Sequence, residues 1–384
     1  MYDWRPGGFG LYVHWPFCQA KCPYCDFNSH VSSAVAVSDW RAAYRAEIAR
    51  YAEETSGRVL QTIYIGGGTP SLMDPDLIAD IIQTARANWP MSNDLEVTLE
   101  ANPSSVEAGR FRDYREAGVN RVSLGVQALD DASLKALGRL HNKLEALTAL
   151  DIARSTFDRV NFDLIYARQF QTLAAWKDEL SEAISMAGDH LSLYQLTIED
   201  GTAFAERERR GRLPGLPDEA LSADMFDLTQ DMTSAAGLPP YEVSNHAKAG
   251  AESRHNMIYW RGGDYIGVGP GAHGRITTER ARFATESHRS PAVWLERALK
   301  LGSGESSRAT LDPDEMGTEY LLMSLRTKEG LDLRRYEVMR GKGLPEGKMR
   351  DLIALGLVWT SDGHVGTTAA GRPLLNAVLR DLCD

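Results

Sequence analysis

A regular alternation of short β-rich runs with longer helical patterns occupies the first two thirds of the chain. Six runs have the composition of strands and span residues 11–15, 61–65, 95–100, 119–126, 160–166 and 190–198. Between them, apolar residues recur at steps of three and four, which is the period of an amphipathic helix. Alternation of this kind predicts parallel βαβ units joined by right-handed crossovers.

Six such units are too few for a closed eight-stranded barrel, and no dinucleotide-binding fingerprint favours an open sheet. We therefore predict an α/β fold with a partial (β/α)6 barrel over residues 1–200 and functional residues at the carboxyl ends of its strands. Residues 201–305, rich in glycine and proline, are expected to close the barrel mouth. Residues 306–384 follow the order helix, helix, hairpin, helix, which predicts a small winged-helix-like α+β domain.

The composition is that of a globular protein, with 43% apolar and 25% charged residues. A net charge of −11 makes nucleic acid an unexpected main partner, because phosphate-backbone binders carry basic surfaces. No apolar run approaches the roughly 20 residues that span a bilayer. The first ten residues, MYDWRPGGFG, lack the features of a signal peptide. We expect a cytoplasmic protein, monomeric or dimeric, that is not integral to a membrane.

Three of the four cysteines lie within eight residues, directly after the first expected strand. They are Cys18, Cys22 and Cys25, whereas Cys383 stands alone near the carboxyl terminus. Three thiolates on a compact loop can ligate three irons of a [4Fe–4S] cluster. The fourth iron then has no protein ligand and is open to a small molecule.

A mononuclear zinc site is the alternative use of these cysteines. His14 or His30 would supply the fourth ligand. Structural zinc sites usually combine two CxxC pairs, whereas this loop has the spacing CxxxCxxC. The spacing therefore favours the cluster and leaves zinc as a minor possibility.

The loop and its surroundings resemble a known superfamily. CxxxCxxC after a first strand is similar to the radical S-adenosylmethionine (SAM) superfamily, and residues 12–30, YVHWPFCQAKCPYCDFNSH, resemble its coproporphyrinogen III oxidase-like branch, in particular the HemW heme chaperones. The resemblance runs from about Gly10 into the C-terminal domain. It implies a [4Fe–4S] cluster, SAM and heme as bound groups.

A glycine-rich segment, residues 65–70 with the sequence IGGGTP, ends the second expected strand. Glycines at such a turn let the backbone approach a ligand, although a tight strand-to-helix turn alone would also explain them. The segment resembles the part of radical SAM proteins that binds the methionine end of SAM. The resemblance thus assigns Gly67, Gly68 and Thr69 to the cofactor pocket.

Further polar residues fall at or near the ends of the expected strands. The resemblance assigns SAM contacts to Glu100, Gln127, Arg139 and Asp163, with Tyr12 and Tyr24 as aromatic walls. Carboxylates suit an ammonium group or ribose hydroxyls, and a guanidinium suits a carboxylate. For each residue taken alone, the alternative is that it is a solvent-exposed polar residue at the rim of the barrel, with no ligand contact.

Two features separate this chain from the true coproporphyrinogen oxidases. Those enzymes carry an additional cysteine two residues after the third ligand, where this chain has Phe27, and a longer segment before the first strand. The chain also departs from the branch after the fifth strand, where Ala167-Arg168-Gln169 replaces the usual Gly-Leu-Pro. We expect the loop at 167–169 to lack the usual tight turn.

Residues 255–260 have the sequence HNMIYW, which resembles the HNxxYW motif of the HemW branch. Imidazole is a common axial ligand of heme iron, so the motif predicts His255 as ligand, with Tyr259 and Trp260 packed on the porphyrin. Met257 is a less favoured second ligand of the heme iron, and His273 is a reserve candidate for contact with heme or SAM. Without the resemblance, a capped loop histidine beside core aromatics would be the simpler interpretation.

The resemblance therefore predicts a heme chaperone that delivers heme to respiratory acceptor proteins, with a peripheral position at the inner face of the membrane as one option. The alternative is an oxygen-independent coproporphyrinogen III oxidase of porphyrin biosynthesis, and radical methyl transfer is a third, weaker interpretation. Whether SAM is cleaved or only bound is left open.

Overall fold

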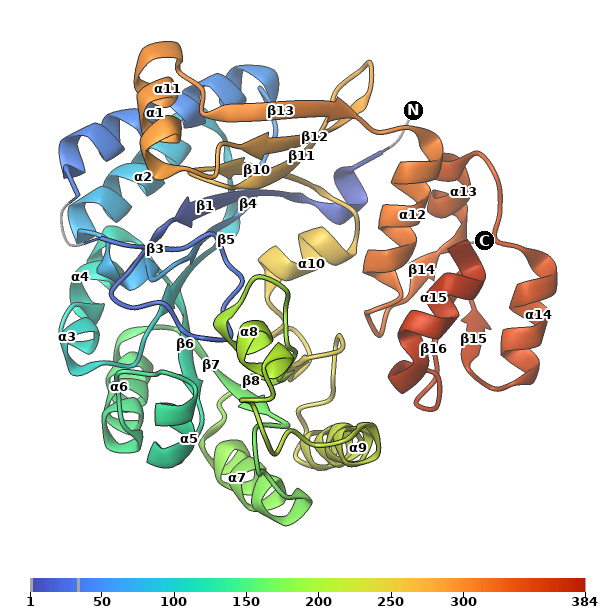
Figure 1. Ribbon diagram of the computed structural model, residues 1–384. Coiled ribbons are helices and arrows are strands. Elements are labelled where there is room, and N and C mark those ends of the chain that lie inside the picture. The colour runs from blue at the N-terminus through green and yellow to red at the C-terminus, as the bar shows by residue number, and fades with distance from the viewer. Residues whose placement is uncertain (1–2, 33–34, 384) are drawn as a thin grey trace.

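The computed structural model (Figure 1) describes residues 3–32 and 35–383. Its strands are β1 (Phe9–Trp15), β2 (Phe17–Cys18), β3 (His30–Val31), β4 (Leu60–Gly67), β5 (Met91–Ala101), β6 (Arg121–Gln127), β7 (Arg159–Tyr166), β8 (His190–Gln195), β9 (Asn245–Ala247), β10 (Asp264–Val268), β11 (His273–Thr277), β12 (Arg282–Ser287), β13 (Glu305–Thr310), β14 (Leu331–Asp332), β15 (Val358–Ser361) and β16 (His364–Thr367). Its helices are α1 (Val37–Glu54), α2 (Pro75–Asn88), α3 (Ser105–Ala108), α4 (Phe111–Ala117), α5 (Asp131–Ala136), α6 (Lys143–Thr156), α7 (Leu173–Met186), α8 (Ala203–Arg209), α9 (Glu219–Ala235), α10 (Arg254–Trp260), α11 (Pro291–Leu301), α12 (Pro313–Ser324), α13 (Leu333–Arg340), α14 (Glu346–Ala354) and α15 (Leu375–Cys383), with short 3-10 turns at Arg5–Gly7, Pro70–Leu72 and Arg372–Leu374.

All six expected strands form, as β1, β4, β5, β6, β7 and β8. They lie side by side in this order and every neighbouring pair is parallel. Helices α1, α2, α4, α6 and α7 cover the outer side of the curved sheet (Figure 1). This arrangement confirms the α/β fold built from βαβ units. Within the described ranges, no helix is both long and apolar enough to cross a membrane.

The sheet extends beyond the six expected strands at both of its edges. β10 pairs with β1 in parallel, β11, β12 and β13 follow it in antiparallel order, and β9 pairs antiparallel with β8. The described part of the sheet thus has eleven strands in the order β13-β12-β11-β10-β1-β4-β5-β6-β7-β8-β9. Its two edge strands do not pair with each other, so the barrel is partial, as expected. None of these added strands, β9 to β13, was predicted from the sequence.

The C-terminal region has its own small core. A cluster of buried side chains that includes Tyr320, Leu321, Tyr336 and Val365 is distinct from the main core cluster around the sheet. The elements run α12, β14, α13, α14, the hairpin β15–β16 and α15, in keeping with the expected winged-helix-like order. Three helices, α12, α13 and α14, precede the hairpin, whereas the sequence predicted two. The division of the chain at residues 200 and 305 stays a prediction. Residues 1–2 and 33–34 of the first segment and residue 384 of the last lie outside the described residues.

Candidate functional site

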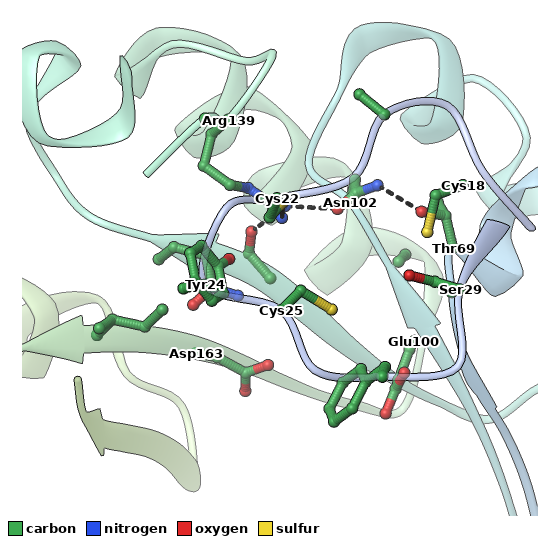
Figure 2. Close-up of a pocket in the computed structure, with 18 of the residues that line it drawn as sticks. Cys18, Cys22, Tyr24, Cys25, Ser29, Thr69, Glu100, Asn102, Arg139 and Asp163 are labelled. Carbon is green, nitrogen blue, oxygen red and sulfur yellow. Dashed lines mark hydrogen bonds between the residues drawn. The ribbon is translucent and has the colours of Figure 1, made fainter. Parts of the chain in front are cut away.

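The three-cysteine loop connects β2 to β3, directly beyond the carboxyl end of β1. β2 and β3 pair in parallel and fix both ends of the loop. Cys18 is buried, Cys22 and Cys25 are half-buried, and all three line one cavity of about 380 Å³. Figure 2 shows this cavity with the loop along one side and Glu100 and Asp163 from the barrel strands. A volume in this range is typical of pockets that enclose a small molecule.

The surroundings of the thiols combine burial with nearby positive charge. Burial raises the pKa of Cys18 and of Cys25 above the usual value of a thiol. Nη1 of Arg139 lies 3.5 Å from Sγ of Cys22. A guanidinium at this distance favours an anionic sulfur, and the thiolate is the form of cysteine that binds iron.

The donor set fits a cluster better than a single zinc ion. Both ring nitrogens of His14 are engaged, Nδ1 with the Tyr12 hydroxyl at 2.9 Å and Nε2 with the Asn28 carbonyl at 2.9 Å. His14 is therefore not free to complete a zinc site with the cysteines. A cubane instead takes three thiolates, each on a different iron. Cys18, Cys22 and Cys25 all line the same cavity, as three such ligands would.

The glycine segment at the end of β4 is packed against the strand that leads into the cysteine loop. Gly68 N donates to the Trp15 carbonyl at 2.7 Å, and a Cβ on Gly68 would lie 2.6 Å from the Phe17 carbonyl oxygen. Gly67 has φ +114°, and a Cβ there would meet the Trp15 carbonyl at 2.7 Å. The expectation was that these glycines make room for a ligand. In the structure they make room for the backbone of β1 and β2, and Gly67, Gly68 and Thr69 also line the cavity.

Glu100 and Asp163 contribute two buried carboxylates to the cavity. Glu100 accepts hydrogen bonds from the Tyr64 hydroxyl at 2.7 Å and from Gly67 N at 3.1 Å. Burial raises the pKa of Glu100 to about 7 and that of Asp163 to about 6, against the effect of their hydrogen bonds. Burial disfavours the charged form of a carboxyl group, and a cation placed beside it restores that form. The cavity is therefore suited to a ligand with positive charge.

Gln127 and Arg139 also line the cavity, each in an unusual setting. Gln127 ends β6 with φ 72°, in the left-handed region that side chains other than glycine adopt at a cost. Strained residues of this kind concentrate at ligand sites. The guanidinium of Arg139 donates to the Gly125 carbonyl at 2.8 Å and to Asn102 Oδ1. In this structure the guanidinium of Arg139 thus contacts Cys22 of the cysteine loop and oxygens of the barrel.

Sequence reasoning missed several residues that line this cavity, among them Asn102 and Tyr64. Asn102 follows β5 and links Arg139 to Thr69, whose Oγ1 lies 3.3 Å from Asn102 Nδ2. Tyr64 points from β4 to Glu100. Asn102 stands directly before Pro103 at the end of an expected strand, and this position was a signal that could have found it. Tyr64 carries no signal, because alternation along a strand does not tell which face becomes the cavity wall.

Of the predicted cofactor-binding residues, Tyr12 and His255 lie apart from this cavity. Tyr24 lines it, whereas Tyr12 lines a second, adjoining cavity. His255 lines neither. Its Nδ1 lies 2.6 Å from Thr62 Oγ1 and its Nε2 lies 2.6 Å from the Tyr259 hydroxyl. Burial lowers the pKa of His255 to about 3, so the imidazole is neutral.

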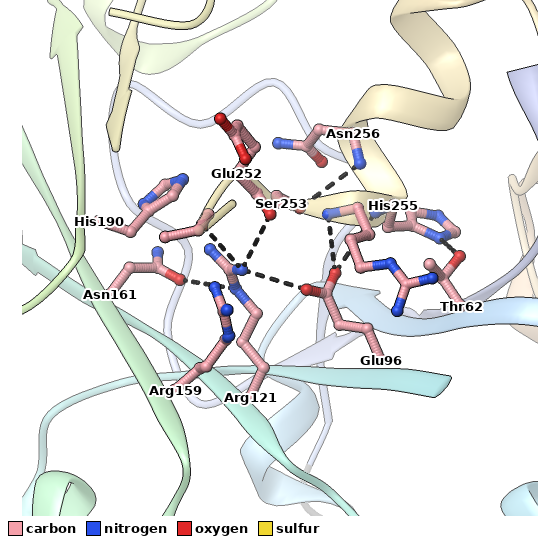
Figure 3. A network of polar contacts seen from close by, with 12 residues as sticks. Thr62, Glu96, Arg121, Arg159, Asn161, His190, Glu252, Ser253, His255 and Asn256 are labelled. Carbon is pink, nitrogen blue, oxygen red and sulfur yellow. Dashed lines mark hydrogen bonds and ion pairs between the residues drawn. The ribbon is translucent and has the colours of Figure 1, made fainter. Parts of the chain in front are cut away.

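The helix that carries His255 is anchored by a buried ionic network (Figure 3). Glu96 Oε1 accepts from the backbone N–H groups of Arg254 and His255 at 3.0 and 3.3 Å, at the start of α10. Its other oxygen lies 3.1 Å from Nη1 of Arg121. Glu96 and Arg121 thus hold α10 against the inner face of β4 and β5. In this arrangement His255 belongs to the core, and its role as a heme ligand stays a prediction that the geometry does not support.

The loop after β7, where this chain departs from the usual sequence of the branch, is held by an ion pair of Arg168. The guanidinium of Arg168 is buried, donates to the Ile165 carbonyl at 2.6 Å and pairs with Glu179 at 2.6 Å. Ala167 and Phe170 adopt positive φ values of 57° and 59°. A hydrogen bond from Gln171 N to the Arg168 carbonyl at 3.1 Å closes a tight turn at residues 168–171, so the loop does not lack a tight turn as expected. Asp163 keeps its place in β7.

Comparisons with known proteins agree with this geometry. The family model described as the radical SAM superfamily matches residues 12–181. The heme chaperone HemW of Escherichia coli (strain K12) is 38% identical over 376 residues, which cover 96% of this chain and 96% of that protein. Radical S-adenosyl methionine domain-containing protein 1, mitochondrial, of Bos taurus is 38% identical over 85% of this chain and 75% of its own length. The structure of the coproporphyrinogen III oxidase HemN of Escherichia coli, a radical SAM enzyme, superposes with a TM-score of 0.81 at 22% identity, covering 98% of this chain and 90% of that one. The likeness to HemN shows the fold, and the full-length similarity shows that the chain belongs to the HemW family of radical SAM proteins.

Proposed function

We propose that the chain is a heme chaperone, which binds heme and delivers it to acceptor proteins of respiration. The observation that carries this proposal is the 38% identity to the heme chaperone HemW over 96% of both chains. The HNxxYW motif at residues 255–260 and Phe27 at the position of the oxidases' additional cysteine support it. The likeness to HemN, at 22% identity, does not extend to activity.

Membership of the radical SAM superfamily implies a [4Fe–4S] cluster and SAM. We assign the cluster to Cys18, Cys22 and Cys25, and SAM to the cavity that these cysteines share with Glu100 and Asp163. Bound together, the two groups would supply one-electron chemistry. The chain's own part is to shield the thiols from water, hold carboxylates for a cationic ligand, and keep a guanidinium beside Cys22.

We further propose a cytoplasmic protein that acts as a monomer or dimer. Its acceptors are proteins at the membrane surface, which a peripheral position at the inner face of the membrane would bring within reach. The net charge of −11 keeps such a protein away from nucleic acid and from a merely electrostatic association with anionic lipid.

Heme transfer and coproporphyrinogen oxidation are separable on one anaerobically reconstituted sample. Heme titration should give a saturable Soret band, and incubation with SAM, reductant and coproporphyrinogen III should leave the porphyrinogen unchanged. Transfer is then measured by the appearance of heme in an apo-acceptor separated on a column. Absence of a Soret band would contradict the heme-chaperone proposal. Enzymatic conversion of coproporphyrinogen would support the oxidase alternative.

SAM affinity should depend on both buried carboxylates. Glu100→Gln or Asp163→Asn should weaken binding by roughly 1–3 kcal/mol each, because a charged hydrogen-bonding partner is lost. SAM is cationic and prefers ionised carboxylates, so affinity of the parent should also fall as the pH drops through about 7 and then 6, where Glu100 and Asp163 take up protons. Isothermal calorimetry across this pH range measures both effects. Glu346→Gln, on an exposed helix of the C-terminal region, is the control. Parent-like affinity in both site variants would place SAM elsewhere.

A further inference from the structure

A second cavity of about 670 Å³ adjoins the first and is used by none of the roles assigned so far. The two cavities share Phe27, Gly67 and Glu100. The second one lies between the added strands β10 to β12, the end of the cysteine loop, and α12 of the C-terminal region. Its volume falls within the range of about 300–1,000 Å³ that ligand pockets occupy.

Aromatic side chains from four different segments line this second cavity. They are Tyr12, Phe27, Tyr259, Trp260 and Tyr265. Tyr259 and Tyr265 meet edge to face, with ring centroids 4.5 Å apart, and Phe27 is 57% exposed. Rings around a hollow favour a large flat aromatic ligand, which can stack on them.

His273 lies in this second cavity with the surroundings of a metal ligand. It is on β11, directly across from Glu286 on β12, and its side chain is 61% exposed. Nδ1 of His273 lies 3.9 Å from Oε1 of Glu286. This separation is longer than a hydrogen bond, so Glu286 is a neighbour of the ring and not yet its bonded partner. A carboxylate at one ring nitrogen is the usual partner of a metal-bound histidine, because it orients the ring and leaves the other nitrogen for the metal. His255 and His14 differ, since both ring nitrogens of each are already engaged.

The carboxylates of Glu100, Glu286 and Glu319 line the cavity, and one guanidinium in its wall is available to an anionic group. Arg289 is exposed at the cavity wall and has no carboxylate partner among the described residues. Glu319, which also lines the cavity, is neutralised by Arg275 at 2.7 Å. A guanidinium without a carboxylate partner is suited to the carboxylates of a porphyrin's propionates.

We propose that heme binds in this second cavity, with His273 as its axial ligand, Glu286 behind the ligand and Arg289 at a propionate. The proposal rests on the proposed function, because it names the place where a heme chaperone of this fold holds its cargo. It puts the cargo next to the cluster and SAM cavity, with which it shares Phe27 and Glu100. Tyr259 and Trp260 of the HNxxYW motif then serve as walls, whereas His255 holds the helix in place.

The test is a hemin titration of the full-length protein, followed by optical and EPR spectra of the bound form. His273→Ala should weaken binding at least tenfold and remove the imidazole-type spectrum, and added free imidazole should restore that spectrum. Glu286→Gln should shift the Soret band or the EPR g-values with smaller loss of affinity, and Arg289→Ala should weaken binding severalfold without a spectral change. His364→Ala, on the hairpin of the C-terminal region, is the matched control.

The outcomes separate this inference from the function on which it rests. A parent protein that binds no heme contradicts the proposed function. A parent that binds heme while folded His273→Ala gives the same affinity and spectrum overturns the inference alone. Loss of the imidazole-type spectrum in a His255→Ala protein with a parent-like melting curve would return the ligand to His255 and also overturn it.

Discussion

Replacing Cys18, Cys22 and Cys25 together with alanine is expected to abolish the [4Fe–4S] cluster. The three thiols line one cavity, and no other cysteine among the described residues lies near it, since Cys383 ends α15. Each single variant should also lose most of its cluster, because two thiolates leave a second iron without a protein ligand. Iron and sulfide content per chain and the EPR spectrum of the reduced protein measure the effect.

Loss of the cluster should not unfold the protein, and this makes the result interpretable. The loop is attached at both ends by the β2–β3 pairing and by the hydrogen bond from Thr69 N to the Phe17 carbonyl at 2.8 Å. The triple variant should therefore keep the parent's circular dichroism spectrum. Cys383→Ala is the matched control and should retain full cluster content. Full iron and sulfide in the triple variant, or one zinc per chain in the native protein, would falsify the assignment.

The parallel strands of the barrel could be predicted because their signal is local. Each of β1 and β4 to β8 is a short apolar run next to a helical period, and β1 is buried along nearly its whole length. β10 to β13 lack this signal. β10 has the sequence Asp-Tyr-Ile-Gly-Val and is followed by glycines and a proline. It forms a strand by pairing with β1. In this pairing Phe9 lies opposite Asp264, more than 250 residues away in sequence. Pairing over such a separation is decided by tertiary packing, not by the local pattern.

The same distinction explains which site residues could be found. The resemblance to radical SAM proteins assigned Glu100, Gln127 and Asp163 to SAM, and their positions at or near the carboxyl ends of parallel strands agreed with a common site. All three line the first cavity. His255 was assigned from a motif, and a motif does not fix the direction of a side chain. That direction follows from how Glu96 holds the start of α10, a contact between residues 159 positions apart in sequence. The sequence named Tyr259, Trp260 and His273 as candidate heme contacts, but it could not show that they line one cavity, because the pairing of β10 to β12 was not predicted.

The buried pair of Glu96 and Arg121 provides the prediction with the largest expected effect on stability. Their side chains are 6% and 2% exposed, and the closest N–O distance is 3.1 Å. Glu96→Ala should lower the free energy of unfolding by about 3–5 kcal/mol, because Arg121 would be left as an unpaired buried charge. The same change removes the acceptor for two backbone N–H groups of α10. Urea unfolding followed by circular dichroism measures the difference.

Two further variants separate the charge effect from the loss of contacts. Glu96→Gln keeps an oxygen that can accept from α10, so it should retain the helix anchor and lose mainly the ionic part. The double variant Glu96→Leu/Arg121→Met removes both charges and should be less destabilised than Glu96→Ala, since no unpaired charge remains. Glu296→Ala, which removes an exposed partner of Lys300, should leave the unfolding midpoint close to that of the parent. If Glu96→Ala is as mild as Glu296→Ala, water reaches Arg121, and the network of Figure 3 does not hold α10 in place.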